Sequence, residues 1–491
     1  VESLAATDAV GSCGGGTSRL TTKLYSTVLI DHAVLGRTPE HEDIERAAEE
    51  QINYLRGYFF NTEVKNQRQL AFANAWSNFE IVRITETTYG LDAEIDRPTR
   101  YPEVPPKDYV VRALEHGAIR AEDLATRVDY VADLEAFGCS ETSAALPAKF
   151  DVTLPEDAFL GYWLAAKETR VRRLWRSINA LVNPCGINEL ADLPSPEYFW
   201  YFFEPTREDC TGKMNPRGLV TAKLEISDSI PLPSVATIDT SALSKVKELK
   251  IGLVFGRVVH DEEYASTEEV TRALNDRISP VDPLLSDWDE SSRQFLWFWN
   301  RLPTIATVTS RIVTSEGPHL IARAEGTLNG SGKPFSLRAF FGSTDLYGPK
   351  PPSHWSEALR SMVNDDIFIY AGHSGLGENL RVATLAEQEV QSATRQLDYQ
   401  LLAYLSCYSY TYFDQDQLPT SPLGGGRARA DLLLTAGETY EFGQAALGTL
   451  AFVADALAHD GRARLDRHFT PQDFILYRTF KPSRLREQAS R

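Results

Sequence analysis

The stretches Asp366-Ile-Phe-Ile-Tyr-Ala-Gly-His373 and Leu401-Leu-Ala-Tyr-Leu-Ser-Cys407 decide the fold of the C-terminal third of the chain. Each is a run of apolar and aromatic residues that ends in a reactive side chain. Continuous apolar runs of this kind are typical of strands that are buried on both faces of a parallel sheet. Residues 383–397, between the two runs, predict a crossover helix. The two strands are therefore expected to be parallel and close together in one sheet.

His373 and Cys407 stand at the carboxyl ends of these two predicted strands. Ligands and catalytic groups collect at this edge of an open α/β sheet. An imidazole beside a thiol is an arrangement for nucleophilic catalysis, because the imidazole can activate or orient the thiol. The alternative is that Cys407 is a small buried hydrophobe and that His373 only caps a turn. Their joint placement favours a catalytic Cys–His dyad.

Two short motifs around these residues resemble those of a known family. Tyr370-Ala-Gly-His-Ser is similar to the Tyr-Ser-Gly-His-Gly motif of metacaspases, and Leu405-Ser-Cys-Tyr-Ser resembles the Asp-Ser-Cys-His-Ser motif around their nucleophile. The resemblance to caspase-like cysteine peptidases covers residues 331–460. It implies that Cys407 is the nucleophile and His373 the general base or orienting group. It also implies an oxyanion hole formed by the backbone amides of Cys407 and of Ser374 or Gly375.

Two other functions remain open. A catalytically inactive caspase-like domain would act as a binding or scaffold protein. A serine hydrolase is a further alternative, because Gly372-His-Ser374 after a strand is similar to the Gly-x-Ser-x-Gly nucleophile elbow of α/β-hydrolases. Leu376 stands where that motif requires its second glycine. The residues available to complete a serine triad are Asp455, His459 and His468.

Acidic residues near the predicted active edge suggest which side chain the site accepts at P1. A pocket for Arg or Lys could be lined by these carboxylates, whereas Arg381 could favour an acidic residue instead. Each carboxylate alone is typical of a solvated loop, but their excess favours a basic P1 residue. The candidate substrate-binding residues are Asp366, Glu378, Asp414, Asp416 and Glu438.

Composition and charge narrow the class of partner. The 491 residues suggest roughly two or three domains, and the net charge of −18 argues against nucleic-acid binding, since phosphates would be repelled. No segment has the apolar length of a membrane span. The sequence lacks a Walker loop, a dinucleotide-binding glycine motif and a His-Glu-x-x-His motif, so no cofactor or metal is expected. The expected partner is a peptide or protein substrate.

The remaining cysteines bear on the compartment. Cys185 and Cys210 bracket an aromatic stretch and could form a disulfide, which would indicate an oxidising compartment. Cys13 in Ser-Cys-Gly-Gly-Gly resembles a lipoprotein cleavage box, although the residues before it lack a basic start and an apolar core. A bacterial cell-envelope or secreted location is favoured over the cytoplasmic alternative.

The chain is expected to fold as an α/β protein in four parts. Residues 1–20 predict a flexible tail or tether, and residues 21–215 a mainly helical module that is a candidate for binding a protein partner. Residues 216–330 predict a β-rich segment, either a separate layer or an extension of the C-terminal sheet. Residues 331–480 predict a caspase-like open, mostly parallel sheet with flanking helices. Within the helical module, one face of a helix is formed by Ile44, Ala48, Ile52, Leu55 and Phe59.

Overall fold

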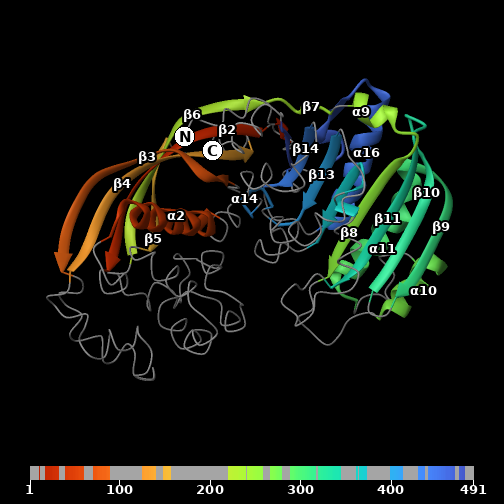
Figure 1. Ribbon diagram of the computed structural model, residues 1–491, viewed down its shortest axis with the longest axis horizontal. Coiled ribbons are helices and arrows are strands. Elements are labelled where there is room, and N and C mark those ends of the chain that lie inside the picture. The colour runs from red at the N-terminus through yellow and green to blue at the C-terminus, as the bar shows by residue number, and fades with distance from the viewer. Residues whose placement is uncertain are drawn as a thin grey trace. The chain divides into compact units, whose positions relative to one another are not determined.

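A computed structural model divides the chain into two compact units (Figure 1). The first unit consists mainly of Arg19–Gly138 and Thr142–Ile230, and the second mainly of Ala5–Ser18 and Pro231–Arg491. The structure describes residues 10–11, 17–31, 39–59, 70–88, 124–139, 148–155, 219–238, 240–257, 266–278, 288–316, 319–343, 361–362, 364–372, 399–407, 409–412, 429–436, 441–469 and 475–480.

The first unit is built on a five-stranded sheet with the strand order β3-β4-β2-β6-β5. β3 pairs antiparallel with β4, and β5 pairs antiparallel with β6. In β2 the even-numbered residues from 18 to 30 are buried, whereas the odd-numbered ones from 19 to 29 are at least partly exposed. This period of two is that of a sheet with one covered face. The strands are β2 (Thr17–Asp31), β3 (Leu70–Thr88), β4 (Leu124–Cys139), β5 (Lys149–Pro155) and β6 (Leu219–Leu232).

Helix α2 (His41–Tyr58) contacts this sheet. It confirms the helix predicted from the spacing of apolar residues at positions three and four apart, a pattern that places them on one face. All the residues of the predicted face are buried: Ile44, Ala48, Ile52, Leu55 and Phe59. Glu42 and Asp43 stand in the first turn, where negative charge is favourable to the helix dipole.

The mainly helical module predicted for residues 21–215 is wrong. The described residues of that range form the helix α2 and the strands β2, β3, β4 and β5, so strands and not helices predominate there. The neighbours of β2 in the sheet are β4 and β6, which are far away in the sequence. Propensity in a local window does not detect such pairing, because tertiary contacts override it.

The second unit is built on a nine-stranded sheet with the order β1-β16-β14-β13-β12-β8-β11-β10-β9. Four strand pairs are parallel (β14–β13, β13–β12, β12–β8 and β8–β11). Four are antiparallel (β1–β16, β16–β14, β11–β10 and β10–β9). The strands are β1 (Val10–Gly11), β8 (Leu249–Arg257), β9 (Ala306–Glu316), β10 (His319–Leu328), β11 (Pro334–Ser343), β12 (Ile367–Ala371), β13 (Tyr399–Leu405), β14 (Arg429–Thr435) and β16 (Ile475–Phe480).

The predicted open, mostly parallel caspase-like sheet is therefore wrong as a fold class. The sheet is mixed, because the antiparallel strands β9 and β10 extend it beyond β11. Of the two possibilities for the β-rich segment, its strands β8, β9 and β10 extend the C-terminal sheet, whereas β6 belongs to the sheet of the first unit. β1 and the start of β2 fall within the segment predicted as a flexible tail.

Helices cover one face of the nine-stranded sheet (Figure 1). α16 (Phe442–Ala458) contacts β12 and β13, α11 (Glu290–Ile305) contacts β8 and β9, and α10 (Thr267–Asp276) contacts β9. Every residue of β12 and β13 is buried, as expected for strands covered on both faces. The smaller elements are β7 (Val235–Thr237), α9 (Thr240–Lys245), α14 (Ser409–Tyr412), β15 (Arg462–Arg464) and the 3-10 helix η9 (Leu465–Arg467).

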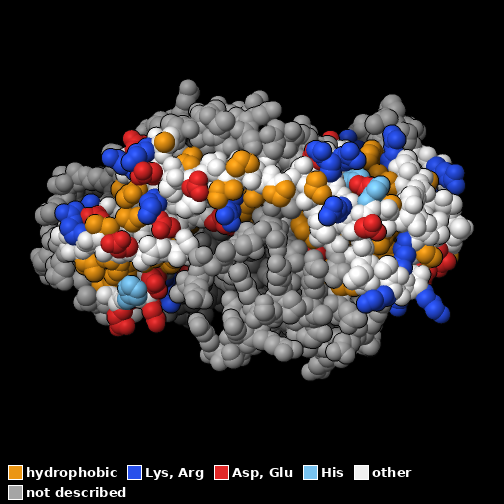
Figure 2. Space-filling model, turned by 90° about the horizontal axis from the view of Figure 1, so that it is seen from above, with side chains coloured by type: hydrophobic (Ala, Val, Ile, Leu, Met, Phe, Trp, Pro, Cys, Tyr) orange, Lys and Arg blue, Asp and Glu red, His pale blue; other side chains and the backbone are white. Residues whose placement is uncertain are grey.

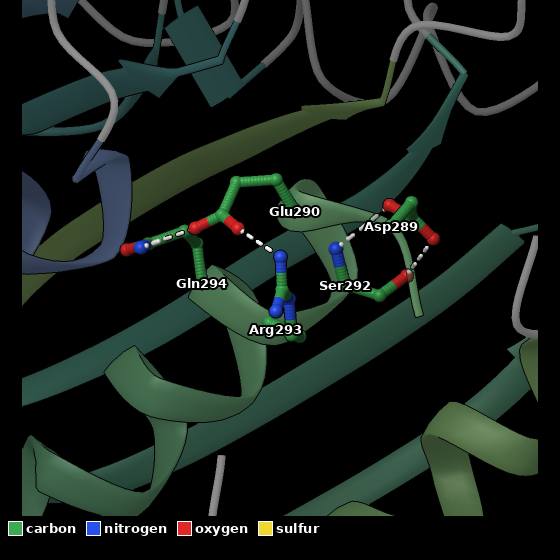
Figure 3. A network of polar contacts seen from close by, with 5 residues as sticks. All are labelled: Asp289, Glu290, Ser292, Arg293 and Gln294. Atoms are coloured by element: carbon green, nitrogen blue, oxygen red, sulfur yellow. Dashed lines mark hydrogen bonds and ion pairs between the residues drawn. The ribbon is translucent and has the colours of Figure 1, made fainter. Parts of the chain in front are cut away.

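The first turn of α11 is held by a network of polar contacts (Figure 3). Asp289 is the N-cap, and its carboxylate accepts the backbone N–H of Ser292 at 2.9 Å. The carboxylate of Glu290 accepts a hydrogen bond from Arg293 Nη2 at 2.5 Å and another from Gln294 Nε2 at 2.8 Å. Glu290 therefore fixes which way the Gln294 amide is turned.

Gln294 links α11 to the start of α16. Its Oε1 accepts the backbone N–H of Gly443 at 3.1 Å, while Glu441, the N-cap of α16, makes no side-chain capping bond. Gln294 thus satisfies one of the amides that the start of a helix leaves open. A Cβ atom on Gly443 would lie 2.3 Å from the carbonyl oxygen of Gln294. The two helices can approach this closely because residue 443 is a glycine.

The surface of the first unit mixes charged and apolar side chains. Figure 2 shows Lys, Arg, Asp and Glu side chains interspersed with hydrophobic ones over its described part. Cross-strand ion pairs join Arg83 to Asp129 at 2.7 Å and Lys23 to Asp133 at 3.1 Å. Pairs of this kind are typical of a solvated face and contribute little to stability. Within the described residues, no helix is both long and apolar enough to cross a membrane.

Candidate functional site

The described part of the candidate site is the carboxyl edge of β12 and β13. The two strands pair in parallel with Ala371 opposite Leu405, which confirms the predicted neighbouring parallel strands. The backbone N–H of Gly372 donates to the carbonyl oxygen of Leu405 at 3.2 Å, and this bond is the last rung between them. Cys407 is the second residue after Leu405, and it is half-buried. His373 comes directly after Gly372 but lies outside the described residues.

Gly372 packs backbone against backbone with the end of β8. A Cβ atom at this position would lie 2.9 Å from both the Cα and the N of Gly256. Real side chains do not tolerate such contacts, so residue 372 must be glycine for the two strand ends to come this close. The approach determines where the chain leaves β12, immediately before His373.

The turn that carries Cys407 is anchored by Ser409. The Ser409 hydroxyl donates to the carbonyl oxygen of Tyr404 at 2.5 Å and accepts the backbone N–H of Thr435 at 2.8 Å. The backbone N–H of Ser409 also donates to the carbonyl oxygen of Ser406 at 3.1 Å. These bonds join the turn to the ends of β13 and β14. A thiol on a turn held in this way is positioned by the rigid sheet.

No protein-family model, curated protein or solved structure matches this chain. The geometry of the edge and the two sequence motifs are therefore the features that indicate a function. Membership of the caspase-like peptidases stays a prediction from those motifs. Within the described residues, no group of three or more His, Cys, Asp or Glu side chains could hold a metal ion.

Asp366 lies at the opposite end of β12 from the candidate site. Its side chain is only 2% exposed, and Oδ2 accepts the backbone N–H of Lys250 at 2.9 Å. The length of β12 separates it from the carboxyl edge by about 16 Å. A pocket at that edge cannot use this carboxylate, so the substrate-binding role predicted for Asp366 is wrong. The other predicted site residues lie outside the described residues: Ser374, Gly375, Glu378, Asp414, Asp416, Glu438, Cys185 and Cys210.

The residues proposed for a serine triad meet away from this edge. Asp455 is contacted by His468 Nε2 and by His459 Nδ1, each at 2.9 Å. All three lie around the last turn of α16 and the elements that follow it, near β15. α16 starts soon after the carboxyl end of β14 and extends for about 25 Å. Ser374 follows the carboxyl end of β12, so the geometry does not favour this triad.

Sequence reasoning missed Ser409, Thr435 and Asp365. Ser409 had a detectable signal, because a serine just after an apolar strand is typical of a turn that bonds to its own backbone. Asp365 adjoins Asp366 at the amino end of β12 and accepts a short hydrogen bond from the Ser361 hydroxyl. Burial raises the pKa of Asp365 above its ordinary value, against the lowering effects of Ser361 and of nearby positive charges.

Replacing Asp365 with asparagine is expected to stabilise the protein at neutral pH. Because its pKa is raised on folding, the folded state binds more protons than the unfolded state between the two pKa values, and stability falls as pH rises through that window. Below the ordinary pKa of 3.8 the Asp365 carboxyl group is protonated in both the folded and the unfolded state, so the free-energy cost of burying its charge is absent. Thermal unfolding near neutral pH should show a higher Tm for Asp365→Asn, and the gain should disappear near pH 3. A gain of equal size at both pH values would contradict this assignment.

Proposed function

We propose that the protein is a cysteine peptidase in which Cys407 is the nucleophile and His373 its partner. The observation that carries the proposal is the parallel register, with Ala371 opposite Leu405 and the last rung at Gly372. Strands that end side by side present the residues that follow them at one edge. The glycine contact before His373 and the Ser409 anchor after Cys407 support a preorganised site.

The proposed reaction is acyl transfer from the substrate amide. The imidazole of His373 takes the proton of the Cys407 thiol, and the thiolate attacks the scissile carbonyl carbon. The tetrahedral oxyanion accepts hydrogen bonds from the backbone amides of Cys407 and of Ser374 or Gly375. When the C–N bond breaks, the imidazolium gives its proton to the leaving amine. Water then hydrolyses the thioester and restores the thiol.

The proposed substrate is a peptide or protein with a basic P1 residue. Since Asp366 is buried at the other end of β12, this preference rests on the remaining candidates, Glu378, Asp414, Asp416 and Glu438. A cell-envelope or secreted location belongs to the same proposal and rests on the motif around Cys13 and on a disulfide between Cys185 and Cys210. These three cysteines lie outside the described residues. The first unit is the candidate for binding a protein partner.

The second candidate function is that of an inactive binding or scaffold protein. One observation favours it: Leu405 is 0% exposed, and it stands where the resembled motif has an acidic residue. A leucine packed in the hydrophobic core cannot supply a carboxylate to a pocket. A domain that has lost this acid could retain the fold of the edge while it has lost peptide hydrolysis.

A peptide-linked electrophile tests the proposed function directly. Peptidyl chloromethyl ketones with Arg, Leu or Asp at P1 would be compared with iodoacetamide, and the modified cysteine mapped by mass spectrometry. A peptidase site should direct the peptide reagents to Cys407 in preference to the other cysteines. His373→Ala should slow this labelling about tenfold or more, because a nearby imidazolium favours the thiolate. Labelling that ignores the peptide part, or that never favours Cys407, would support the binding function instead.

A further inference from the structure

Strand β9 is the outermost strand at one side of the nine-stranded sheet (Figure 1). Among the described strands it pairs only with β10, so its other edge presents backbone N–H and C=O groups that no described strand satisfies. Residues 307–314 of β9 are all at least partly exposed, whereas every residue of the central strand β12 is buried. The free edge is therefore accessible over most of the length of the strand.

β9 lacks most of the features that protect an edge strand from pairing with another chain. Proteins usually make such strands short or place Lys, Pro or a bulge in them. β9 is 11 residues long and contains neither Lys nor Pro. Its one irregularity of register lies next to Ser310, which leaves the rest of the strand regular, and Ile312 there is 53% exposed. An edge of this kind can accept an added strand through main-chain hydrogen bonds.

Arg323 of β10 brings a positive charge to this edge. It is directly opposite Ile312, so the two side chains share one face of the sheet. Its Nη1 donates to Thr314 Oγ1 at 3.5 Å, which shows that the guanidinium extends over β9 towards the free edge. Within the part of the chain that the structure describes, no acidic residue forms an ion pair with Arg323. Its opposite neighbour in β11 is Arg338, a like charge, and Glu325 follows two residues later in β10.

Arg311 of β9 brings a second positive charge, on the face that α11 covers. Its Cζ lies 4.9 Å from the centre of the Trp299 ring, and its Nη2 donates to the carbonyl oxygen of Trp299. Its Nε is buried and has no hydrogen-bond partner among the described residues. Burial and the positive charge of Arg277 lower the pKa of Arg311. The free edge thus carries an arginine on each face, and no described carboxylate pairs with either one.

We propose that β9 is the docking strand for an extended acidic segment of a partner protein, which adds to the sheet by main-chain hydrogen bonds. Because side chains at alternate positions of a strand share one face, such a segment can place a carboxylate against Arg323 and an apolar side chain against Ile312. A hydrogen bond between a guanidinium and a carboxylate is stronger than one between neutral groups. The inference goes beyond the proposed peptidase activity and does not depend on it.

A second copy of this chain is a poorer occupant of the edge. Pairing of β9 with β9 around Ile312 would bring Arg311 and Arg323 of one copy close to the same residues of the other. Like charges that face each other across paired strands are destabilising. The two arginines therefore oppose self-association and favour a strand that carries negative charge.

Fluorescence anisotropy with two labelled peptides tests the charge preference. The probe is Ser-Glu-Thr-Val-Thr-Glu-Ser, which has its glutamates and its valine on one face, and the control peptide has glutamine in place of each glutamate. The full-length protein should bind the probe about tenfold more tightly than the control peptide. Arg323→Glu should weaken binding of the probe by about tenfold or more. Arg272→Glu, the same charge change at an exposed position of α10, is the matched control and should leave the affinity unchanged.

Hydrogen exchange tests whether the peptide adds a strand. With the probe bound, the backbone amides of residues 310–316 should exchange more slowly, and methylation of the backbone nitrogens of the probe should abolish binding. Equal affinity for the two peptides, probe binding that Arg323→Glu leaves intact, or protection confined to other segments would overturn the proposal. The comparison of the two peptides uses the wild type and so does not depend on the folding of any variant. A dimer in sedimentation that Ile312→Asp dissociates would assign the edge to a second copy and would also overturn it.

Discussion

Replacing Cys407 with alanine is expected to abolish peptide cleavage, with a loss of about 10⁴-fold or more. The sulfur forms the covalent bond to the substrate in the proposed reaction, and alanine offers no group that can replace it. The measurement is a peptide-library digest by the wild type and by Cys407→Ala, followed by sequencing of the products. Cys139→Ala is the matched control, because it removes the thiol of the last residue of β4, which is not in the sheet that carries β12 and β13, and it should cleave like the wild type.

The same digest decides the specificity. Residues enriched before the cut identify the P1 preference, which is expected to be Arg or Lys. Enrichment of Asp or Glu would overturn the basic preference and leave the peptidase intact. If no peptide is cut in a way that depends on Cys407, at any pH and with calcium added, the result would favour the binding or scaffold function over catalysis.

Replacing Gln51 with leucine is expected to destabilise the first unit by about 3 to 5 kcal/mol. Gln51 is 0% exposed and joins α2 to the sheet. Its Oε1 accepts hydrogen bonds from Ser26 Oγ at 2.6 Å and from Tyr130 OH at 2.8 Å. Its Nε2 donates to the carbonyl oxygens of Thr27 at 3.0 Å and Pro155 at 2.6 Å. Leucine would leave the buried hydroxyl groups of Ser26 and Tyr130 and the part-buried carbonyl groups of Thr27 and Pro155 without this partner. Each such loss carries a desolvation penalty, which is largest for the buried groups.

Chemical denaturation of the variants measures this effect. Gln51→Glu is the isosteric test: it keeps the oxygen that faces Ser26 and Tyr130 but removes the donor to the two carbonyl groups, so it should also be destabilising. Burial raises the pKa of Tyr130, which keeps its hydroxyl neutral and able to donate. Glu49→Leu, on the exposed side of the same helix, is the control and should change stability by no more than about 0.5 kcal/mol. A Gln51→Leu protein as stable as this control would contradict the role of the amide.

Local pattern in the sequence was enough to predict the core of the candidate site. The apolar runs at 367–371 and 401–405 are strands and parallel neighbours, as predicted, whereas the crossover helix predicted at 383–397 lies outside the described residues. The apolar face of the helix from Ile44 to Phe59 was also predictable, because a period of 3.6 residues is visible within a single segment. These features depend on residues that are close together in the chain, so they can be predicted without knowing which segments far away in the sequence pack against them.

Only the tertiary structure decided the sheet of the first unit, the antiparallel extension of the second sheet, and the bond that holds the Asp366 carboxylate against the backbone N–H of Lys250. The amide of Gln51 and the Gln294 bond to Gly443 were equally invisible, since each depends on a partner more than a helix or strand away. The physical reason is that the hydrogen bonds of a sheet and the burial of its faces come from segments far apart in sequence. A strand such as β2 is stable because β4 and β6 pair with it and one of its faces is covered, not because of its own residues alone.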